Sequence, residues 1–397
     1  MARPTPRRES QLGPMLILAS AAFASTYAGR TAEPLVGVMA RDLASTPETI
    51  ALVTAAFALP FACIKPILGP VADTLGKEFV IKVSLAVLAA SLAASAFAPD
   101  AATLLTLRFV SGIAAGGVNP VGIAIVGDRF PIEQRQVALG RYVMAVLLGQ
   151  LCGASVSGVL AEWTGWRGIF LLSSAIAASA WLAFTTGFEA RPVPPTKLSV
   201  RDSVVRYRAI LAIPRARALF LFVFVEAVAT YGLFPYIAPL FEERGLGGPF
   251  EAGVVLAGFG LGGLLYSLAV TGMMRLGLRR LLIGGGMVAG LALLIFMMSP
   301  DWRLHFVAML LCGYGVFMLH NPYQTQVTEV APEARASAVS LHAFSFFGGQ
   351  AVGVVVIGFG LGSIGFVGTL LLCAVTAVGL GLGSAWALAG PSGQRPR

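Results

Sequence analysis

The sequence predicts an all-α membrane protein whose twelve spanning helices form two similar six-helix bundles. Three observations predict this fold class: an apolar composition, twelve long apolar segments, and a repeat that relates the two halves of the chain. The repeat predicts the division into two bundles, because many membrane proteins are built from internal structural repeats.

The composition indicates a polytopic membrane protein. Of the 397 residues, 57% are apolar and only 12% are charged. Soluble domains carry about 25% charged residues, so an ordinary globular protein is excluded. The four cysteines, Cys63, Cys152, Cys312 and Cys373, lie inside apolar segments and lack metal-ligand spacing. They are expected to be packing residues, and neither a metal site nor a disulfide framework is predicted.

Twelve apolar segments are each long enough to cross a bilayer as a helix, which satisfies its own backbone in lipid. In the first half they span residues 13–39, 48–68, 78–98, 103–126, 137–161 and 168–188. In the second half they span residues 219–240, 252–274, 281–299, 304–327, 336–361 and 365–388.

The basic residues orient the chain in the membrane. With the N-terminus inside, the basic residues that fall outside are Arg41, Arg167, Arg244 and Arg303. Those that fall within the membrane are Arg30, Lys65 and Arg108, of which Lys65 is expected to snorkel to the inner surface. The rest of the 28 lie inside, as the positive-inside rule requires. We therefore expect a multi-pass plasma (inner) membrane protein with both termini cytoplasmic and no nucleic-acid partner.

One long polar stretch divides the chain. Residues 189–217 are rich in arginine and proline, and they predict a cytoplasmic linker with a short amphipathic helix. The domains expected are an N-terminal bundle over residues 1–188, this linker, and a C-terminal bundle over residues 218–397.

The two halves repeat at an offset of about 200 residues. Matching pairs are Arg135 and Arg335, Gly149-Gln150 and Gly349-Gln350, Gly153 and Gly353, Gly158 and Gly358, Asn119-Pro120 and Asn321-Pro322, and Thr26-Tyr27 and Thr230-Tyr231. The glycine pairs predict close helix packing. The two prolines predict breaks at equivalent places in helices 4 and 10.

A polar turn between the second and third segments carries a family pattern. Its Gly69, Asp73, Gly76 and Lys77 match the loop between helices 2 and 3 of the major facilitator superfamily. With the six-plus-six repeat, the whole chain resembles this family, and most closely its bacterial drug and metabolite proton antiporters. Ala154 stands where such antiporters often have proline on helix 5.

The resemblance implies a conformational role for the polar turn. Asp73 would help to close the cytoplasmic side in the outward-facing state, through Arg129 or Arg135 and the positive N-terminus of helix 11. Thr74 and Glu78 replace two basic residues of the family pattern, which weakens an ionic lock built on those positions.

Charged residues inside the membrane are costly and mark candidate functional sites. Arg108 lies in a helix 4 sequence that resembles the family motif whose arginine is linked to proton transfer and substrate binding. Arg30 and Glu33 lie one turn apart on helix 1, so they predict an internal pair. Alternatively, Glu33 pairs with Arg108. Either arginine could hold Glu33 ionised in one conformation and release it in another, which would make Glu33 a proton site.

Helix 7 carries Glu226, which has no basic residue within one turn and is read as an unpaired proton or cation site. Histidine titrates near neutral pH, and His320 adjoins the helix 10 proline, so it is a further candidate. The remaining polar residues of the expected cavity are Asn119, Tyr231, Asn321 and Gln324, together with Tyr27, Gln150, Tyr323 and Gln350.

No enzyme or nucleotide-binding motif occurs in the sequence, so an ion gradient or the substrate's own gradient is expected to drive transport. We expect alternating access with proton-coupled export of a small organic compound, no cofactor, and a monomer. The alternative is an organic-anion carrier for uptake or exchange that clamps carboxylates with Arg30 and Arg108. A non-transporting membrane sensor or scaffold is a third hypothesis.

Overall fold

The computed structural model describes residues 12–188 and 200–388, and every regular element in these ranges is helical. The first half contains α1 (Leu12–Arg30), η2 (Glu33–Leu35), α2 (Val36–Asp42), α3 (Pro47–Leu75), α4 (Lys77–Ser95), α5 (Ala101–Gly116), α6 (Val118–Arg129) and α7 (Ile132–Gly187). The second half begins with α8 (Val200–Ala212), α9 (Pro214–Tyr231), η3 (Phe234–Tyr236), α10 (Ile237–Glu243), α11 (Pro249–Met273) and η4 (Met274–Leu276). It continues with α12 (Leu278–Met298), α13 (Trp302–Val330), η5 (Pro332–Ala334), α14 (Arg335–Ser363) and α15 (Gly365–Leu388).

The helices correspond to the twelve predicted spans. Within the described ranges, ten segments are long and apolar enough to cross a membrane. One of them contains two spans, because α7 turns at Gly165, whose φ of 64° is not helical. The remaining span is helix 1, formed by α1, η2 and α2. The predicted all-α membrane fold is therefore confirmed.

Helices 1 and 7 are interrupted at equivalent places, which the sequence analysis did not predict. A 3₁₀ turn that contains Pro34 follows α1, and one that contains Pro235 follows α9. Helix 4 is interrupted at Gly117, close to the predicted break, but α13 continues through Pro322. The predicted break in helix 10 is wrong, since a membrane helix tolerates one lost backbone hydrogen bond when its neighbours pack around it.

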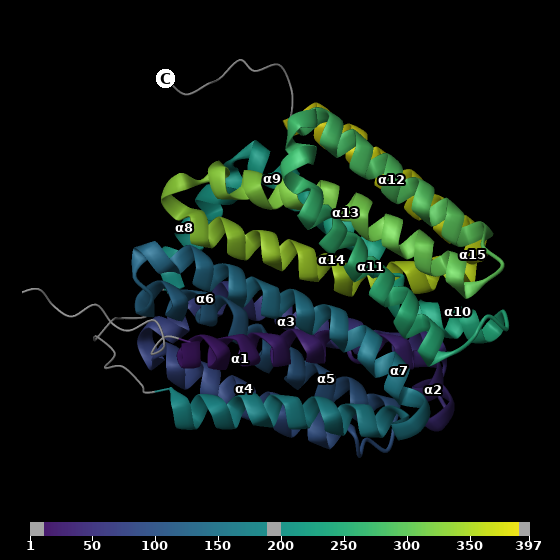
Figure 1. Ribbon diagram of the computed structural model, residues 1–397, viewed down its shortest axis with the longest axis horizontal. Helices are drawn as coiled ribbons and strands as arrows, with labels where there is room; N and C mark the ends of the chain where they lie inside the picture. The colour runs from purple at the N-terminus through teal and green to yellow at the C-terminus, as the bar shows by residue number, and fades with distance from the viewer. Residues whose placement is uncertain (1–11, 189–199, 389–397) are drawn as a thin grey trace, which may run out of the picture.

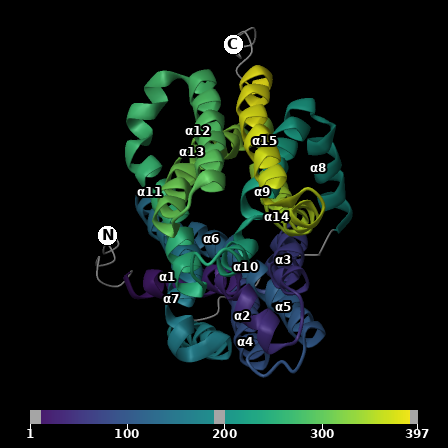
Figure 2. The same ribbon diagram turned by 90° about the vertical axis from the view of Figure 1, so that its right-hand side faces the viewer.

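The helices form two bundles, with the first half below and the second half above in Figure 1. Contacts between the bundles join α3 to α14 and α7 to α11. Figure 2 places these two seams on opposite sides of the molecule, with α11 above α7 and α14 above α3. We call the end of the bundles at α8 the α8 end and the opposite end, at α2 and α10, the α10 end.

Repeated glycines let the helices within each bundle approach closely. A Cβ on Gly153 of α7 would lie 2.5 Å from the Tyr27 carbonyl oxygen of α1. A Cβ on the equivalent Gly353 of α14 would lie 2.8 Å from the Val228 carbonyl oxygen of α9. The predicted close approach is confirmed at both positions, and it fixes helices 1 and 7 against their neighbours.

Acidic caps also repeat between the halves. Asp100 accepts a hydrogen bond from the Thr103 amide at the start of α5, and Asp301 accepts one from Arg303 at the start of α13. These amide contacts favour the ionised carboxylate and lower the pKa of both exposed aspartates. Each cap therefore stabilises its helix while the carboxylate is ionised.

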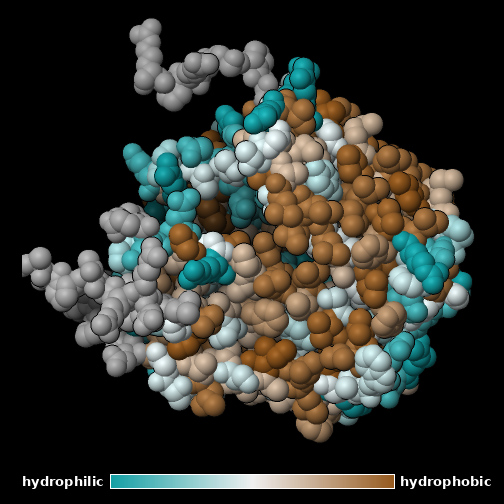
Figure 3. Space-filling view, in the orientation of Figure 1, coloured by the Kyte–Doolittle hydropathy of each residue, from teal (hydrophilic) through white to brown (hydrophobic). Residues whose placement is uncertain are grey.

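Apolar side chains cover the middle of the surface. In Figure 3 a broad hydrophobic band crosses the molecule, and hydrophilic residues gather toward its two ends. Large apolar side chains that are exposed include Leu264, Leu291 and Phe359. Because apolar residues face lipid without cost, the band agrees with a bundle that spans the bilayer.

Candidate functional site: a cavity between the two bundles

A cavity of about 280 Å³ lies between the bundles, beside the breaks of helices 1 and 7. Its walls come from α1 and η2, the first part of α7, α9 and η3, α11, and α13. The lining residues are Arg30, Glu33, Met144, Leu147, Leu148, Gln150, Leu151, Ala154, Tyr231, Phe234, Leu256, Phe259, Gly260, Gly263, Leu264, Ser267 and Phe317. Both halves therefore contribute to one site, as an alternating-access carrier requires.

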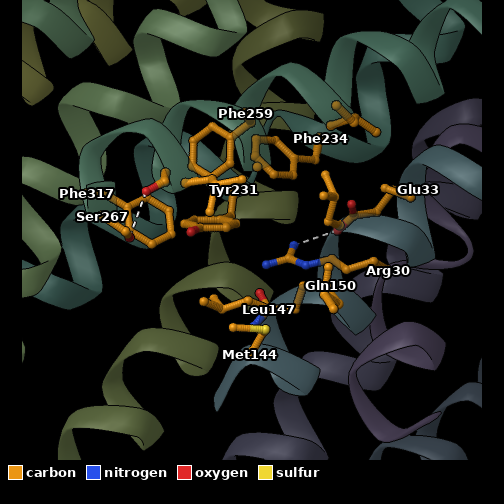
Figure 4. A pocket seen from close by; sticks show the side chains of 17 residues that line it. Arg30, Glu33, Met144, Leu147, Gln150, Tyr231, Phe234, Phe259, Ser267 and Phe317 are labelled. Carbon is orange, nitrogen blue, oxygen red and sulfur yellow. Dashed lines mark hydrogen bonds and ion pairs between the residues drawn. The ribbon is translucent and has the colours of Figure 1, made fainter. Parts of the chain in front are cut away.

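A buried ion pair lies in the helix 1 wall. The Arg30 guanidinium donates from one Nη to Glu33 Oε1 at 2.7 Å, across the junction between α1 and η2 (Figure 4). Arg30 is 7% exposed and Glu33 is fully buried. The second carboxylate oxygen of Glu33, Oε2, has no hydrogen-bond partner. A buried charge needs a partner to remain ionised, so the state of Glu33 depends on Arg30.

The local sequence places this pair. Arg30 occupies the last turn of α1, where the negative end of the helix dipole favours a cation. Glu33 is the first residue of the 3₁₀ turn and Pro34 is the second. Because a 3₁₀ turn is tighter than an α-helical turn, it brings the Glu33 carboxylate back toward Arg30. The sequence prediction of an Arg30–Glu33 pair is thus realised in the structure.

Aromatic rings form the opposite wall. The Arg30 guanidinium lies 4.7 Å from the Tyr231 ring centroid and 5.6 Å from that of Phe234. Phe259 packs on both rings, with centroid separations of 5.3 and 5.0 Å. The break of helix 7 therefore presents aromatic faces to the ion pair in the break of helix 1. Such a wall suits an apolar or aromatic ligand with one charged group.

Arg108 does not line the cavity. It is fully buried in α5, where it donates to the carbonyl oxygens of Ala28 at 3.0 Å and Val53 at 3.4 Å. Its guanidinium lies 4.4 Å from the Phe57 ring centroid. The structure therefore pairs Glu33 with Arg30 rather than with Arg108, and it does not bring Arg30 and Arg108 together as a carboxylate clamp.

The second membrane carboxylate is paired across helices. Glu226 of α9 is 1% exposed, and its Oε2 lies 3.1 Å from Nδ1 of His320 on α13. The His342 ring of α14 lies 5.4 Å from the His320 ring. The prediction that Glu226 is unpaired is therefore wrong. The partner lies on another helix, so a search along helix 7 alone could not find it.

The predicted neutral cavity residues are dispersed. Tyr231 and Gln150 line the cavity, whereas Asn119 accepts a hydrogen bond from the Tyr142 hydroxyl at 3.3 Å. His320, Asn321 and Gln324 are absent from the lining, and Gln324 is exposed. Sequence reasoning missed Phe234, Phe259 and Phe317. The available signal was the repeat, because Glu33-Pro34 and Phe234-Pro235 are equivalent when the offset is 201 instead of 200.

The residues of the predicted cytoplasmic gate lie at the α8 end. Lys77 pairs with Asp128 at 2.6 Å, and Arg129 pairs with Glu78 at 2.7 Å. Arg135 donates to the Gly127 carbonyl oxygen at 2.5 Å. Gly76 joins α3 to α4 with a φ of 96°, a conformation that glycine adopts without strain.

The predicted gate also includes Gly69 and Asp73. The surroundings of these two residues are not among those that the structure describes. Glu78, which replaces a basic residue of the family pattern, supplies the carboxylate that binds Arg129.

Lys65 does not snorkel as predicted. It is 8% exposed, and its ammonium lies 4.2 Å from the Phe61 ring centroid and 5.0 Å from that of Phe347. These rings belong to α3 and α14, so the lysine is held in a seam between the bundles. Cation–π contact with two rings compensates part of the cost of its burial.

The α10 end of the cavity is closed. The turns η2 and η3 contact each other, and α2 contacts α10. Arg41 of α2 forms an ion pair with Glu242 of α10, 201 residues further along the chain. The same elements that frame the ion pair and the aromatic wall thus also join the two bundles at this end.

Two six-helix bundles around a shared cavity, with a buried ion pair between them, define the fold and site of a polytopic membrane carrier. The sequence profile of the Major Facilitator Superfamily matches residues 18–353 and 248–397. The chain belongs to this superfamily, and it is therefore a secondary transporter of the membrane rather than an enzyme.

Comparison with individual proteins agrees with this membership. The chain is 24% identical to the uncharacterized MFS-type transporter YybF of Bacillus subtilis, over 86% of this chain and 87% of that protein. It is 34% identical to the multi-drug resistance efflux pump PmrA homolog of Lactococcus lactis, over 32% of each chain. A crystal structure of a mutant of the nucleoside transporter NupG superposes with a TM-score of 0.74 at 17% identity, over 94% of this chain and 99% of that one.

Proposed function

We propose that this transporter exports a small organic compound in exchange for protons, by alternating access. The observation that carries the proposal is the Arg30–Glu33 pair at 2.7 Å in the wall of the cavity between the bundles. A carboxylate that faces the ligand and depends on one cation can gain or lose a proton when the ligand changes that contact. The partial similarity to a drug efflux pump supports export.

The orientation proposed is the one that the basic residues favour. The α8 end faces the cytoplasm, both termini are cytoplasmic, and the chain divides into bundles 1–188 and 218–397 with the linker 189–217 between them. Because the α10 end is closed by contacts between η2 and η3, we assign this arrangement to an inward-facing state.

Glu33 is the proposed proton site. Its Oε1 contacts Arg30, which favours the ionised carboxylate, while its buried Oε2 has no hydrogen-bond partner and can take a proton. A ligand with a cationic group that binds this carboxylate requires it to be deprotonated, so ligand and proton compete for Glu33 and ligand binding releases the proton. Glu226 is the second candidate, because its Oε1 is buried without a hydrogen-bond partner while Oε2 contacts His320.

The α8 end carries the proposed cytoplasmic gate. We assign the gating role to Asp73 on the family resemblance, together with the loop residues Gly69, Gly76 and Lys77. Arg129 and Arg135 lie on the adjoining segments of the same bundle, where Arg129 holds Glu78. On outward opening this surface would meet the N-terminus of helix 11.

An organic-anion carrier is the second candidate function. Arg30 favours it, because its guanidinium faces the cavity and could exchange Glu33 for a carboxylate of the substrate. Arg108 does not share that role in the state described, since it lies outside the cavity lining and donates to the carbonyl oxygens of Ala28 and Val53. Uptake or exchange would then proceed without a proton.

The test is proton release from the purified transporter in detergent on addition of a panel of small organic cations and anions. Wild type, Glu33→Gln and Glu226→Gln are compared, with Glu162→Gln on the exposed face of α7 as the control. Release that disappears in Glu33→Gln but persists in the other variants supports proton exchange at Glu33. Ligand binding without proton release in wild type would contradict it and favour the anion carrier.

A further inference from the structure

The central cavity reaches the flank of the molecule between α7 and α11. Met144 and Leu148 of α7 and Leu264 of α11 line the cavity, yet they are 61%, 46% and 52% exposed. At its deep end Glu33 is fully buried. The cavity therefore extends from a buried ion pair to an exposed apolar rim, which we define as Met144, Leu147, Leu148 and Leu264.

The seam between α7 and α11 is closed only toward the α10 end. A Cβ on Gly158 would lie 2.7 Å from the Gly253 Cα, so the two backbones touch there. Further along, a Cβ on Gly260 would lie 2.5 Å from Leu151 Cδ1. The rim residues Met144 and Leu147 lie on the α8 side of Leu151, where they line the cavity instead of closing the seam.

The opposite seam, between α3 and α14, is filled at the corresponding level. The rings of Phe61 and Phe347 meet with centroids 4.5 Å apart, and Lys65 packs against both. The two flanks seen in Figure 2 are thus unlike, although the repeat relates their helices. An apolar hollow on the α3–α14 flank, lined by Leu59 and Val352 among others, shares no lining residue with the cavity, whereas the rim on the α7–α11 flank belongs to it.

The chemistry of the rim points to lipid rather than water on its outer side. All four rim side chains are aliphatic or thioether, and all four are exposed. Like the other exposed apolar side chains of the protein, they suit contact with lipid. A water-filled mouth would leave these chains hydrated, at a cost that polar side chains would avoid. Acyl chains contact them without that cost.

We propose that this rim is a lateral portal to the cytoplasmic leaflet, through which a membrane-partitioned amphiphile reaches the Arg30–Glu33 pair. The proposal rests on the proposed function for its substrate and on the proposed orientation for the leaflet. The polar head of the ligand meets the ion pair, and its apolar body lies along Phe259 and Leu264. A cavity of about 280 Å³ limits the enclosed part to a small ligand, since pockets that bind drug-sized ligands measure roughly 300–1,000 Å³.

The test measures what each rim position contacts, and it needs no substrate. Single cysteines are placed at Leu148 and Leu264 after the four native cysteines are replaced, and a nitroxide is attached to each in proteoliposomes. Collision rates with oxygen, which concentrates in lipid, and with a water-soluble nickel chelate are compared by electron paramagnetic resonance. Leu382→Cys on the apolar surface of α15 is the lipid reference, and Arg279→Cys at the start of α12 is the water reference.

Rim labels that match the Leu382 reference, with oxygen collisions dominant, support the portal. Collision with the nickel chelate at the level of the Arg279 reference would show a water-filled mouth and overturn it, as would protection from both reagents. Failure of proton release on ligand addition would remove the proposed exchange but leave this result intact, so the two proposals fail separately. Gel filtration of each labelled variant shows that it is folded.

Discussion

At the residue scale, burial and hydrogen bonding separate the two membrane arginines that the sequence treats alike. Arg30 faces the cavity and binds one carboxylate, which a ligand can displace. Arg108 is held by carbonyls of two other helices and stacks on Phe57. The first arrangement lies within helix 1 and faces the cavity, whereas the second joins helices 1, 2 and 4.

Arg108→Met should therefore destabilise the N-terminal bundle. Its loss removes hydrogen bonds from a charged donor to the carbonyl oxygens of Ala28 and Val53, worth about 1.5–3 kcal/mol each. Thermal unfolding in detergent measures the effect, with Arg303→Met at an exposed position as the control.

A second variant separates fold from chemistry. Arg108→Lys, where it folds, should keep ligand-dependent proton release because the cation and part of its donor capacity remain. A stable Arg108→Lys protein that binds ligand but releases no proton would show that Arg108 takes part in proton transfer itself.

At the element scale, close packing of α7 on α1 positions the ion pair. Gly153 abuts the Tyr27 carbonyl and the Arg30 Cβ. Because glycine has no side chain, helix 1 can pack closely against α7 at this position. The same arrangement recurs at Gly353 in the second bundle. Helix 1 can break after Arg30 and still hold its register because α7 supports it.

Alanine at two positions of α7 should have opposite effects. Gly153→Ala forces a Cβ to within 2.9 Å of the Arg30 Cβ and should lower the melting temperature, at a cost of about 1–3 kcal/mol. Gly140→Ala meets nothing within 4 Å and should stabilise the helix by up to about 1 kcal/mol.

Differential scanning fluorimetry of both variants measures the sign of each change in melting temperature. Equal melting temperatures for Gly153→Ala and Gly140→Ala would show that the contact with helix 1 relaxes, and the packing argument for the position of Arg30 would be wrong.

At the scale of the whole molecule, contacts between the two bundles close the cavity at the α10 end. Arg41 and Glu242 occupy equivalent positions of the two halves and meet across the bundle boundary. Their side chains are 62% and 22% exposed, so solvent screens the pair and its contribution is only about 0.2–1 kcal/mol. Such a contact can bias an equilibrium between states that are closed and open at the α10 end without locking it.

Arg41→Ala should raise the population of the state that is open at the α10 end by up to about fivefold, since every 1.4 kcal/mol is a factor of ten. Spin labels at Glu48→Cys and Glu243→Cys, which are exposed on different bundles, report the change as a longer distance in double electron–electron resonance. The charge exchange Arg41→Glu with Glu242→Arg should restore the wild-type distribution. An unchanged distribution in Arg41→Ala would rule out a role for this pair in closing the α10 end.

The sequence alone determined the class of fold. Lipid offers no hydrogen-bond partner, so twelve apolar segments had to be helices, and the repeat placed them in two bundles. It also proposed Arg30 as a partner of Glu33, with Arg108 as the alternative, because Arg30 and Glu33 lie one turn apart in helix 1. These properties depend on local chain geometry and on the solvent, both of which can be read from the order of residues.

Only the tertiary structure decided how distant residues meet. The His320 contact of Glu226, the carbonyl partners of Arg108 and the aromatic burial of Lys65 all cross between helices. The breaks after Arg30 and Tyr231, and the continuous helix at Pro322, likewise depend on packing by neighbours. A span can be inferred from its own residues, but which face it buries, and against what, is a property of all twelve helices together.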